Sequence, residues 1–443
     1  MSQTNQARYQ SFADAAGIDL AAIQPLSRDE RIKKLETIIE LEDVPHPIPV
    51  SLRQPYLDAA RSGKLFSIGE FSGKLVELGE YTNSQDYEQY TFEEHLSWAV
   101  LVAEQQKTKH QFACREYLEG EALFEIGESV IPDYYLLNAR IFQQTSWQLA
   151  TVSEIIPAEL FFTCHSRRFF PVTTFMRPLG TDYLEEPDIG HDVAGHVATF
   201  TIPAVAQVMQ HHGEARNMIY AERDEKIKAA GDNKAKIEEA KTEADELLKY
   251  AGRIYWFTVE FGLVMQDNDV RDFGAGILSS PGETVYSVSS PESNRVLIDP
   301  SNDGDLLRIA NTDYLINEFQ KTYFICESFE LLESLTPERI LAASKKAKSL
   351  PDFTWREIVP GDRVINVGSV ATSPNEKYYR LMAGQPLDDC LKRTAIANLE
   401  MHRNGISDEL LSQLRALPPS IPPEVIEWYE TIGKFNVLKA KLN

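Results

Sequence analysis

The stretch PDIGHDVAGH, from Pro187 to His196, decides how the fold of this chain is interpreted. It places His191 and His196 five positions apart at the start of a predicted helix, in a chain that has nine histidines in all. Two imidazoles from one short segment are two of the three ligands of a 2-His-1-carboxylate iron site. Asp188 directly follows Pro187 and is a suitable N-cap for the helix.

The spacing of the two histidines argues against a zincin. A zincin helix carries H-E-x-x-H, with its histidines four positions apart on one face and a general base beside the first. Five positions correspond to about 140° around an ideal α-helix, so both imidazoles reach one metal only if His191 lies at the frayed start of the helix. Another pair, His211 and His212, is adjacent in a polar stretch, and we do not expect these residues to be ligands.

The expected third ligand is Glu260, in the apolar run RIYWFTVEFGLVM. This run indicates a buried helix or, as the alternative, a core strand. At helical spacing Glu260 shares a face with Trp256, Phe257, Leu263 and Val264, which points its carboxylate inward. A buried carboxylate must be protonated, ion-paired or bound to metal, so the alternative to a metal is a structural pair with an arginine such as Arg253.

Four sequence blocks, in order, resemble the catalytic domain of the pterin-dependent aromatic amino acid hydroxylases, the family of the phenylalanine, tyrosine and tryptophan hydroxylases. The blocks are PDIGHDVAGH, RIYWFTVEFGL, FGAGILSSPGE and NEFQKTYFICESF. A weaker match continues upstream through FACREYLEG and IPAELFFTCHSRRFFPVTTFMRP, so the resemblance covers about Tyr90 to Phe329. It implies a mainly α fold, with an aromatic amino acid hydroxylase-like catalytic core, a few short strands, and additional N- and C-terminal regions.

The resemblance implies roles for individual residues. The implied ligands of Fe(II) are His191, His196 and Glu260. Arg177 matches the family's arginine that binds the substrate carboxylate, and Asp188 matches the residue that holds this arginine, a bidentate arrangement that suits both groups. Ser279 matches a hydroxyl near the same carboxylate.

Other matches concern the substrate ring and the cofactor. Trp256 matches a substrate-pocket tryptophan of the phenylalanine and tyrosine enzymes, and Ile316 is apolar, as in the phenylalanine enzymes. Phe161 and Tyr255 match aromatics that pack beside the pterin, and Asp192 stands in place of a glutamate near the pterin.

Three further positions depart from the family pattern. Leu184 replaces a threonine that helps to hold the substrate backbone, Pro171 replaces a histidine beside the pterin in phenylalanine hydroxylases, and Ala198 breaks the usual GHVP ending. We therefore expect a monooxygenase that hydroxylates an aromatic amino acid ring with O₂, non-haem Fe(II) and a tetrahydropterin similar to tetrahydrobiopterin. Phenylalanine is the first choice of substrate, and another aromatic substrate or ring position is the alternative. Two other classes stay open, a metal-dependent hydrolase with Asp192 as its base and a catalytically silent binding protein.

Composition agrees with an enzyme acting on small molecules. The net charge of −23 argues against a nucleic-acid partner, and no apolar run is long enough to span a membrane. The four cysteines are far apart, without a CxxC motif, and the first residues lack the features of a signal peptide, which predicts a cytoplasmic protein.

The chain divides into three predicted regions. Residues 1–85 form an N-terminal region of unknown role, residues 86–335 the catalytic domain, and residues 336–443 a C-terminal region of unknown role. The last region is expected to hold a helix at Pro337–Lys348, short strands within Ile358–Val370, and two closing helices. Residues 222–249 form a predicted helical insertion, whose glutamates are the alternative source of the third ligand. The oligomeric state stays open.

Overall fold

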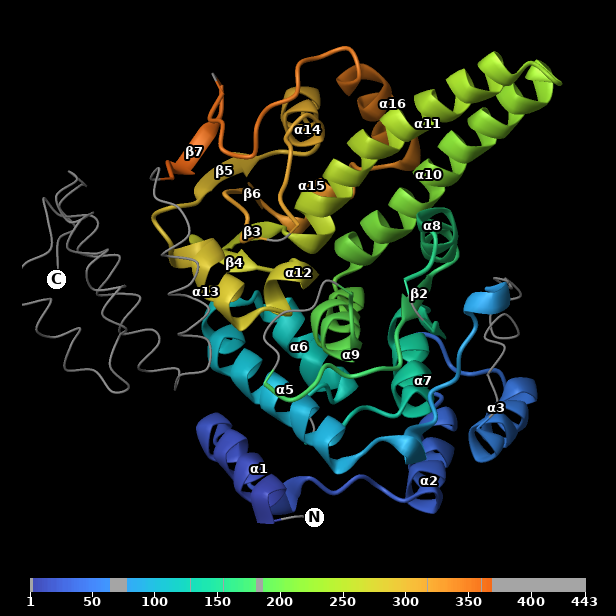
Figure 1. Ribbon diagram of the computed structural model, residues 1–443, viewed down its shortest axis with the longest axis vertical. Coiled ribbons are helices and arrows are strands. Elements are labelled where there is room, and N and C mark those ends of the chain that lie inside the picture. The colour runs from blue at the N-terminus through green and yellow to red at the C-terminus, as the bar shows by residue number, and fades with distance from the viewer. Residues whose placement is uncertain are drawn as a thin grey trace, which may run out of the picture.

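The computed structural model of this chain describes residues 3–63, 78–127, 129–153, 155–180, 186–316, 318–359 and 361–368. Within these residues the protein is mainly α-helical and has seven short strands, which confirms the predicted fold class. Two expectations fall outside the described residues, namely the position of Leu184 and the two closing helices. Figure 1 shows the helices surrounding α9, the short helix at the centre that begins the histidine segment.

The N-terminal helices pack on helices of the predicted catalytic domain. They are α1 (Gln3–Ala16), η1 (Leu20–Ala22), α2 (Arg28–Ile39) and α3 (Val50–Ser62). Apolar residues of α1, such as Tyr9 and Ala13, pack with Leu96 and Val100 of α5 (Phe92–Phe112). Helices α2 and α3 share a second cluster with α7 (Tyr134–Thr145), so residues 3–63 lie against the body of the protein (Figure 1).

Two long helices form an antiparallel hairpin that projects from the body (Figure 1). They are α10 (Pro203–Ala230) and α11 (Lys234–Tyr255), and Asn233 caps the second through its side chain. The predicted insertion is the outer part of this hairpin, shared between both helices rather than one extension. Ion pairs join its two arms, as in Lys226–Glu243, and tie it to the C-terminal α16 (Pro337–Ala347), as in Lys345–Glu222.

Five short strands form a mixed sheet in the order β4-β3-β6-β5-β7. Their bounds are β3 (Leu263–Gln266), β4 (Asp269–Asp272), β5 (Asn294–Ile298), β6 (Thr322–Cys326) and β7 (Arg363–Asn366). The β3–β6 and β6–β5 pairs are parallel, and the two edge strands are antiparallel to their neighbours. Strand β7 and helix α16 confirm the strand and the helix predicted after residue 336.

The remaining elements surround the centre of the molecule. They are η2 (Gly79–Tyr81), η3 (Tyr87–Gln89), α6 (Arg115–Phe124), β1 (Gln148–Thr151), α8 (Ala158–Ser166), β2 (Phe169–Val172), α9 (Ile189–His191), η5 (Val197–Thr201), α12 (Ala275–Leu278), α13 (Pro281–Ser289), α14 (Asp303–Ala310) and α15 (Phe329–Leu332). Strands β1 and β2 form a separate parallel pair. Within the described residues, none of the helices is both long and apolar enough to cross a membrane.

The buried histidine of α5 makes the stability of the protein depend on pH. His95 is 2% exposed, its Nδ1 accepts a hydrogen bond from the N–H of Ile131 at 3.2 Å, and burial lowers its pKa to about 4. An unfolded histidine has a pKa of about 6.5, so the unfolded chain binds an extra proton between pH 6.5 and 4. This contribution to stability is therefore retained above pH 6.5 and decreases as the pH falls through that window.

We expect His95→Asn to make the free energy of unfolding less dependent on pH. Asparagine keeps an acceptor near the position of Nδ1 but cannot be protonated, so at pH 5 it removes a penalty of about 1 to 2 kcal/mol. Urea unfolding at pH 7.5 and pH 5 measures this difference. The matched control is His110→Asn, at an exposed position of the same helix. Equal pH dependence in the wild type and the His95 variant would contradict the prediction.

Candidate active site

The histidine segment contains a π-helical turn, which brings two histidines five positions apart onto one face. Helix α9 ends at His191, and the next five residues, Asp192–His196 (η4), form the π-helical turn. A π-helix joins residues five apart, so His191 and His196 come to lie on one face, with ring centroids 5.1 Å apart. The predicted N-cap is confirmed, because Asp188 Oδ1 accepts a hydrogen bond from the His191 N–H at 3.1 Å.

A second π-helical turn carries Glu260. Helix α11 continues into Trp256–Glu260 (η6), where the N–H of Phe261 donates to the Trp256 carbonyl at 2.8 Å. The chain then enters β3 at Leu263. The prediction of one continuous helix through this run is therefore wrong, and Leu263 and Val264 do not share a helical face with Glu260. The inward direction of the Glu260 carboxylate was correct, but the widened last turn of the helix is what produces it.

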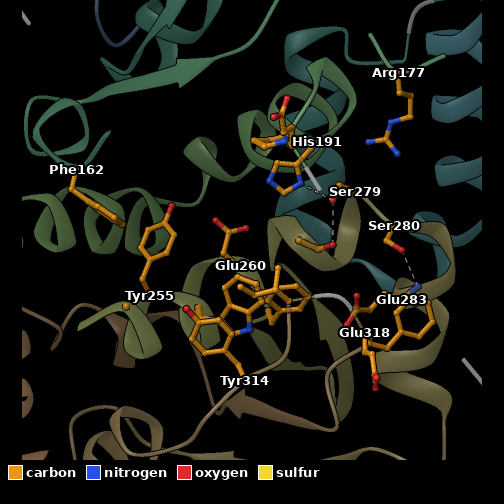
Figure 2. Close-up of a pocket in the computed structure, with 18 of the residues that line it drawn as sticks. Phe162, Arg177, His191, Tyr255, Glu260, Ser279, Ser280, Glu283, Tyr314 and Glu318 are labelled. Carbon is orange, nitrogen blue, oxygen red and sulfur yellow. Dashed lines mark hydrogen bonds between the residues drawn. The ribbon is translucent and has the colours of Figure 1, made fainter. Parts of the chain in front are cut away.

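The three expected ligands converge on one point. One ligand atom from each of His191, His196 and Glu260 lies within 4.8 Å of the other two, and the Nε2 of His196 is 3.3 Å from Oε1 of Glu260. Figure 2 shows Glu260 and His191 directed toward each other across the site. The Nδ1 of His191 lies 3.1 Å from the hydroxyl of Ser279, which leaves its Nε2 available for a metal. Two imidazoles and one carboxylate at this distance fit a divalent iron.

The charges around this cluster also suit a metal. Burial lowers the pKa of His191 to about 4, which keeps the imidazole neutral, as a ligand must be. Burial acts to raise the pKa of Glu260, but His196, His191 and Tyr255 together outweigh it, and the pKa lies below its usual value. The alternative partner, Arg253, instead pairs with Asp313 and Asp352 at 3.0 and 2.8 Å. Glu260 is therefore not part of a structural pair with that arginine.

Glycines let helix α12 lie directly against both π-helical turns. A Cβ on Gly195 would lie 2.8 Å from the carbonyl oxygen of Ala275, and a Cβ on Gly274 would lie 2.5 Å from the carbonyl oxygen of Glu260. Both values are shorter than a Cβ tolerates against backbone. The glycines of the FGAG block and of the histidine segment therefore allow the two π-helical turns to pack closely against α12.

A buried lysine holds the first of these turns. The Nζ of Lys109 donates to the Ala194 carbonyl at 2.7 Å and to Oε1 of Glu121 at 2.6 Å, and Tyr117 also donates to the Ala194 carbonyl. The carbonyls of a π-helical turn are not all bonded within the turn, so buried donors from outside stabilise it. Helices α5 and α6 thus fix the position of the histidine segment.

The predicted guanidinium clamp is present beside the metal ligands. Asp188 accepts from Nε of Arg177 at 2.8 Å and from Nη2 at 2.6 Å, one bond to each carboxylate oxygen. Both side chains are buried. Asp188 therefore performs two tasks, since it orients Arg177 and also caps the helix that carries His191.

Two of the clustered ligands, His191 and Glu260, and Arg177 of the clamp line one cavity of about 390 Å³. Its walls are largely aromatic. Trp256 stacks between Tyr314, at 4.2 Å between ring centroids, and Phe261, at 4.6 Å. Ser279 and Arg177 also line the cavity, and Ile316 lies at its rim with 63% of its surface exposed. This arrangement suits a flat apolar group bound beside a metal.

Comparison with known proteins identifies the family. Residues 80–230 and 239–338 match the family described as biopterin-dependent aromatic amino acid hydroxylase. The chain belongs to this family. A phenylalanine-4-hydroxylase of Chromobacterium violaceum is 35% identical over 298 residues, 67% of this chain and 90% of that protein. One of Caulobacter vibrioides is 34% identical over 293 residues, 66% of this chain and 90% of that protein.

Solved structures support the same assignment. The Chromobacterium violaceum phenylalanine hydroxylase with bound iron(III) and 7,8-dihydrobiopterin aligns with a TM-score of 0.55 and 32% identity, over 68% of this chain and 98% of that chain. The predicted family, enzyme class, iron and pterin are thus confirmed for this aromatic amino acid hydroxylase. The hydrolase and the silent binding protein are set aside. Asp192, the base that a hydrolase would have used, instead has its carboxylate bonded to Thr173. It accepts hydrogen bonds from the N–H and the hydroxyl of Thr173, at 2.8 and 2.9 Å.

Of the three residues of the hydroxylase that were expected beside the pterin, only Tyr255 lines the cavity. Tyr255 lines the cavity, but the other aromatic lining residue on that side is Phe162 rather than Phe161. Phe161 packs on the ring of His165 instead, with centroids 4.3 Å apart. Burial raises the pKa of Asp192 to about 7, and this residue is absent from the cavity lining. The cofactor roles of Phe161 and Asp192 stay predictions.

Several lining residues of the hydroxylase were not predicted. They include Phe162, Arg216, Glu283 and Tyr314. His212, expected in a polar stretch, is fully buried beside Tyr255, whereas His211 bonds the Leu335 carbonyl at 2.9 Å. The only signal for Arg216 and His212 in the sequence was their spacing of four on a long helix, which places both on one face.

Proposed function

We propose that this hydroxylase converts phenylalanine to a ring-hydroxylated product with O₂, Fe(II) and a tetrahydropterin. The observation that carries this proposal is that His191 and Glu260 of the ligand cluster and Arg177 of the clamp line the same aromatic-walled cavity. The relatives named phenylalanine-4-hydroxylase support the same substrate. We further propose that it works in the cytoplasm, since the described cysteines are free, buried thiols.

In this proposal Arg177 binds the substrate carboxylate. Its guanidinium is already oriented by two bonds to Asp188, so little side-chain freedom is lost when the substrate binds. Ser279 lies in the same cavity lining, and its hydroxyl also contacts His191. The amino acid end of the substrate is thereby held at a defined distance from the metal ligands.

The aromatic wall orients the substrate ring. Trp256 is fixed by its stacking on Tyr314 and by the hydrogen bond from its Nε1 to Gln320 at 3.2 Å. Ile316 contributes apolar surface at the rim and no charge. An unsubstituted phenyl ring needs no polar partner, so these walls favour phenylalanine over a ring that carries a hydroxyl.

The metal and the cofactor would occupy the centre of the cavity. His191, His196 and Glu260 would hold Fe(II), and Tyr255 and Phe162 would flank the pterin. Fe(II) and the tetrahydropterin together supply the activation of O₂. The residues of the chain orient the two organic ligands, keep His191 neutral and surround the reacting groups with apolar side chains that exclude water.

A turnover assay on a panel of aromatic amino acids, together with metal analysis, tests this proposal. We expect bound iron, and tyrosine formed from phenylalanine in step with pterin oxidation. Pterin oxidation without product from phenylalanine would overturn the substrate alone. Product at another ring position, detected by chromatography, would correct the position of hydroxylation and leave the rest intact.

A further inference from the structure

The cavity contains a second arginine that the chemistry described above does not use. Arg216 of α10 is 7% exposed and lines the cavity. Arg177 has a carboxylate partner in Asp188, whereas Arg216 forms no ion pair with any residue that the structure describes. The Nε of Arg216 is buried and has no hydrogen-bond partner in the described part of the chain.

Among the described residues, the groups around Arg216 offer it aromatic rings and hydroxyls but no carboxylate. Its guanidinium carbon lies 3.8 Å from the centroid of the Phe162 ring. Burial lowers the pKa of Arg216, and the groups that act against burial are the hydroxyl of Tyr220, which is also hydrogen-bonded to the arginine, and the hydroxyls of Tyr314 and Tyr255. Phenol groups with raised pKa values are neutral, so they do not balance the charge of a guanidinium.

A glycine on the facing helix makes room for this side chain. A Cβ on Gly252 of α11 would lie 3.1 Å from Nη2 of Arg216, closer than most real contacts of a Cβ. Gly252 lines the same cavity. The guanidinium therefore fits between α10 and α11 at the wall of the cavity, where a ligand can reach it.

A cation buried without a counter-ion is unfavourable, and an anionic ligand compensates for it. Removing a charge from water costs several kcal/mol unless the charge is paired and hydrogen-bonded. A carboxylate or a phosphate can accept two parallel hydrogen bonds from a guanidinium, which a neutral hydroxyl cannot. Because no described residue supplies a negative charge to Arg216 and its Nε has no hydrogen-bond partner there, the site points to a ligand that brings this charge.

The two arginines serve different ends of the cavity. In Figure 2 Arg177 lies on one side of His191 and Glu260, and Phe162 and Tyr255 lie on the other. Arg216, stacked on Phe162, belongs to the second side. In the proposed function Arg177 binds the carboxylate of the amino acid substrate. The anion beside Arg216 would therefore belong to the other organic ligand, the pterin.

We propose that Arg216 selects the cofactor: it binds a carboxylate or phosphate on the side chain of the reduced pterin. This inference rests on the proposed function, because it needs the pterin to bind beside Tyr255 and Phe162. The chain would then bind a pterin whose side chain is anionic more tightly than one whose side chain is neutral and hydroxylated.

Calorimetric binding of dihydropterins to the iron-loaded protein tests the proposal without turnover. Three ligands share one ring and differ in the side chain, which ends in a carboxylate, a phosphate or a neutral hydroxyl. We expect the wild type to bind at least one anionic pterin about 10 to 100 times more tightly than the neutral one, as charge-assisted hydrogen bonds do. The carboxylate and phosphate arms show which anion is preferred.

Three variants assign the effect to Arg216. Arg216→Gln should bind all three pterins with similar Kd values, and Arg216→Lys should keep part of the preference. The matched control is Arg223→Gln, two turns further along α10, where the arginine pairs with Glu159 outside the cavity lining. It should keep the full preference. Iron content and circular dichroism establish that each variant is folded and loaded.

Each outcome decides one of the two proposals. Equal Kd values for anionic and neutral pterins in the wild type overturn the role of Arg216, and so does an unchanged preference in Arg216→Gln. Phenylalanine hydroxylation supported by a neutral pterin leaves the proposed function standing in both cases. If no pterin binds to the iron-loaded wild type, the proposed function fails as well.

Discussion

Glu260→Gln is expected to remove most of the bound iron and to lower the rate of hydroxylation by a factor of about 100 or more, while the fold persists. The carboxylate is the only negatively charged group among the three clustered ligands, and its Oε1 lies 3.3 Å from Nε2 of His196. A neutral amide is a poor ligand for a hard divalent cation, and even changes outside the ligand shell cost 10- to 100-fold in metal affinity.

The fold should survive because glutamine has the same size and the turn is held by backbone contacts. The N–H of Phe261 donates to the Trp256 carbonyl, and Gly274 packs against the carbonyl of Glu260. Neither contact involves the Glu260 side chain. Iron per chain and the Tm of the variant measure the two parts of this prediction separately.

The control belongs in the helical hairpin, whose glutamates were the other candidates for the third ligand. Glu243 pairs with Lys226 between the two arms, so Glu243→Gln should keep its iron and its activity. Full retention of iron in Glu260→Gln, with loss in Glu243→Gln, would move the third ligand into the hairpin. Loss of iron in the first variant alone supports the assignment made from the structure.

The sequence was sufficient to predict that His191, His196 and Glu260 come together, because they are distinguished by residue type. A close pair of histidines and one carboxylate in an apolar run are scarce in any chain. The sequence could not predict the π-helical turns at Asp192–His196 and Trp256–Glu260, because such turns depend on packing from outside, by Lys109 and by the glycines of FGAG. The spacing rules for a regular helix therefore identified the segment that carries His191 and His196, but not the π-helical turn that brings them onto one face.

The cavity walls were less predictable than the ligands. Phe161 and Phe162 are adjacent on α8, and the packing of that helix decides which of them faces the cavity. A Cβ on Gly213 of α10 would lie 2.4 Å from the Phe162 carbonyl, so the close approach of the two helices sets the rotation of α8. Tyr314 and Arg216 reach the cavity from distant parts of the chain; no local pattern marks Tyr314, and the only signal for Arg216 is its spacing of four from His212.

Arg177→Gln is expected to raise the KM for phenylalanine by a factor of about 30 to 1,000, with a smaller effect on kcat. Loss of one partner from a buried, hydrogen-bonded charge pair costs about 2 to 4 kcal/mol. The effect should vanish for phenethylamine, which lacks the carboxylate, so the variant loses the ability to prefer phenylalanine over this amine. Steady-state kinetics on both compounds measure the change, and iron content shows that the metal site is intact.

Asp188 allows the role of the clamp to be separated from that of the helix cap. Asparagine is as good an N-cap as aspartate, so Asp188→Asn should keep the bond to the His191 N–H and retain iron. It loses the negative charge and one of the two acceptors of Arg177, so the KM for phenylalanine should still rise by about tenfold or more. Asp188→Ala loses both functions, leaves the buried Arg177 without its carboxylate, and should also lower stability by about 3 to 5 kcal/mol. An unchanged KM in Asp188→Asn, with iron retained, would show that the carboxylate of the substrate binds elsewhere than at Arg177.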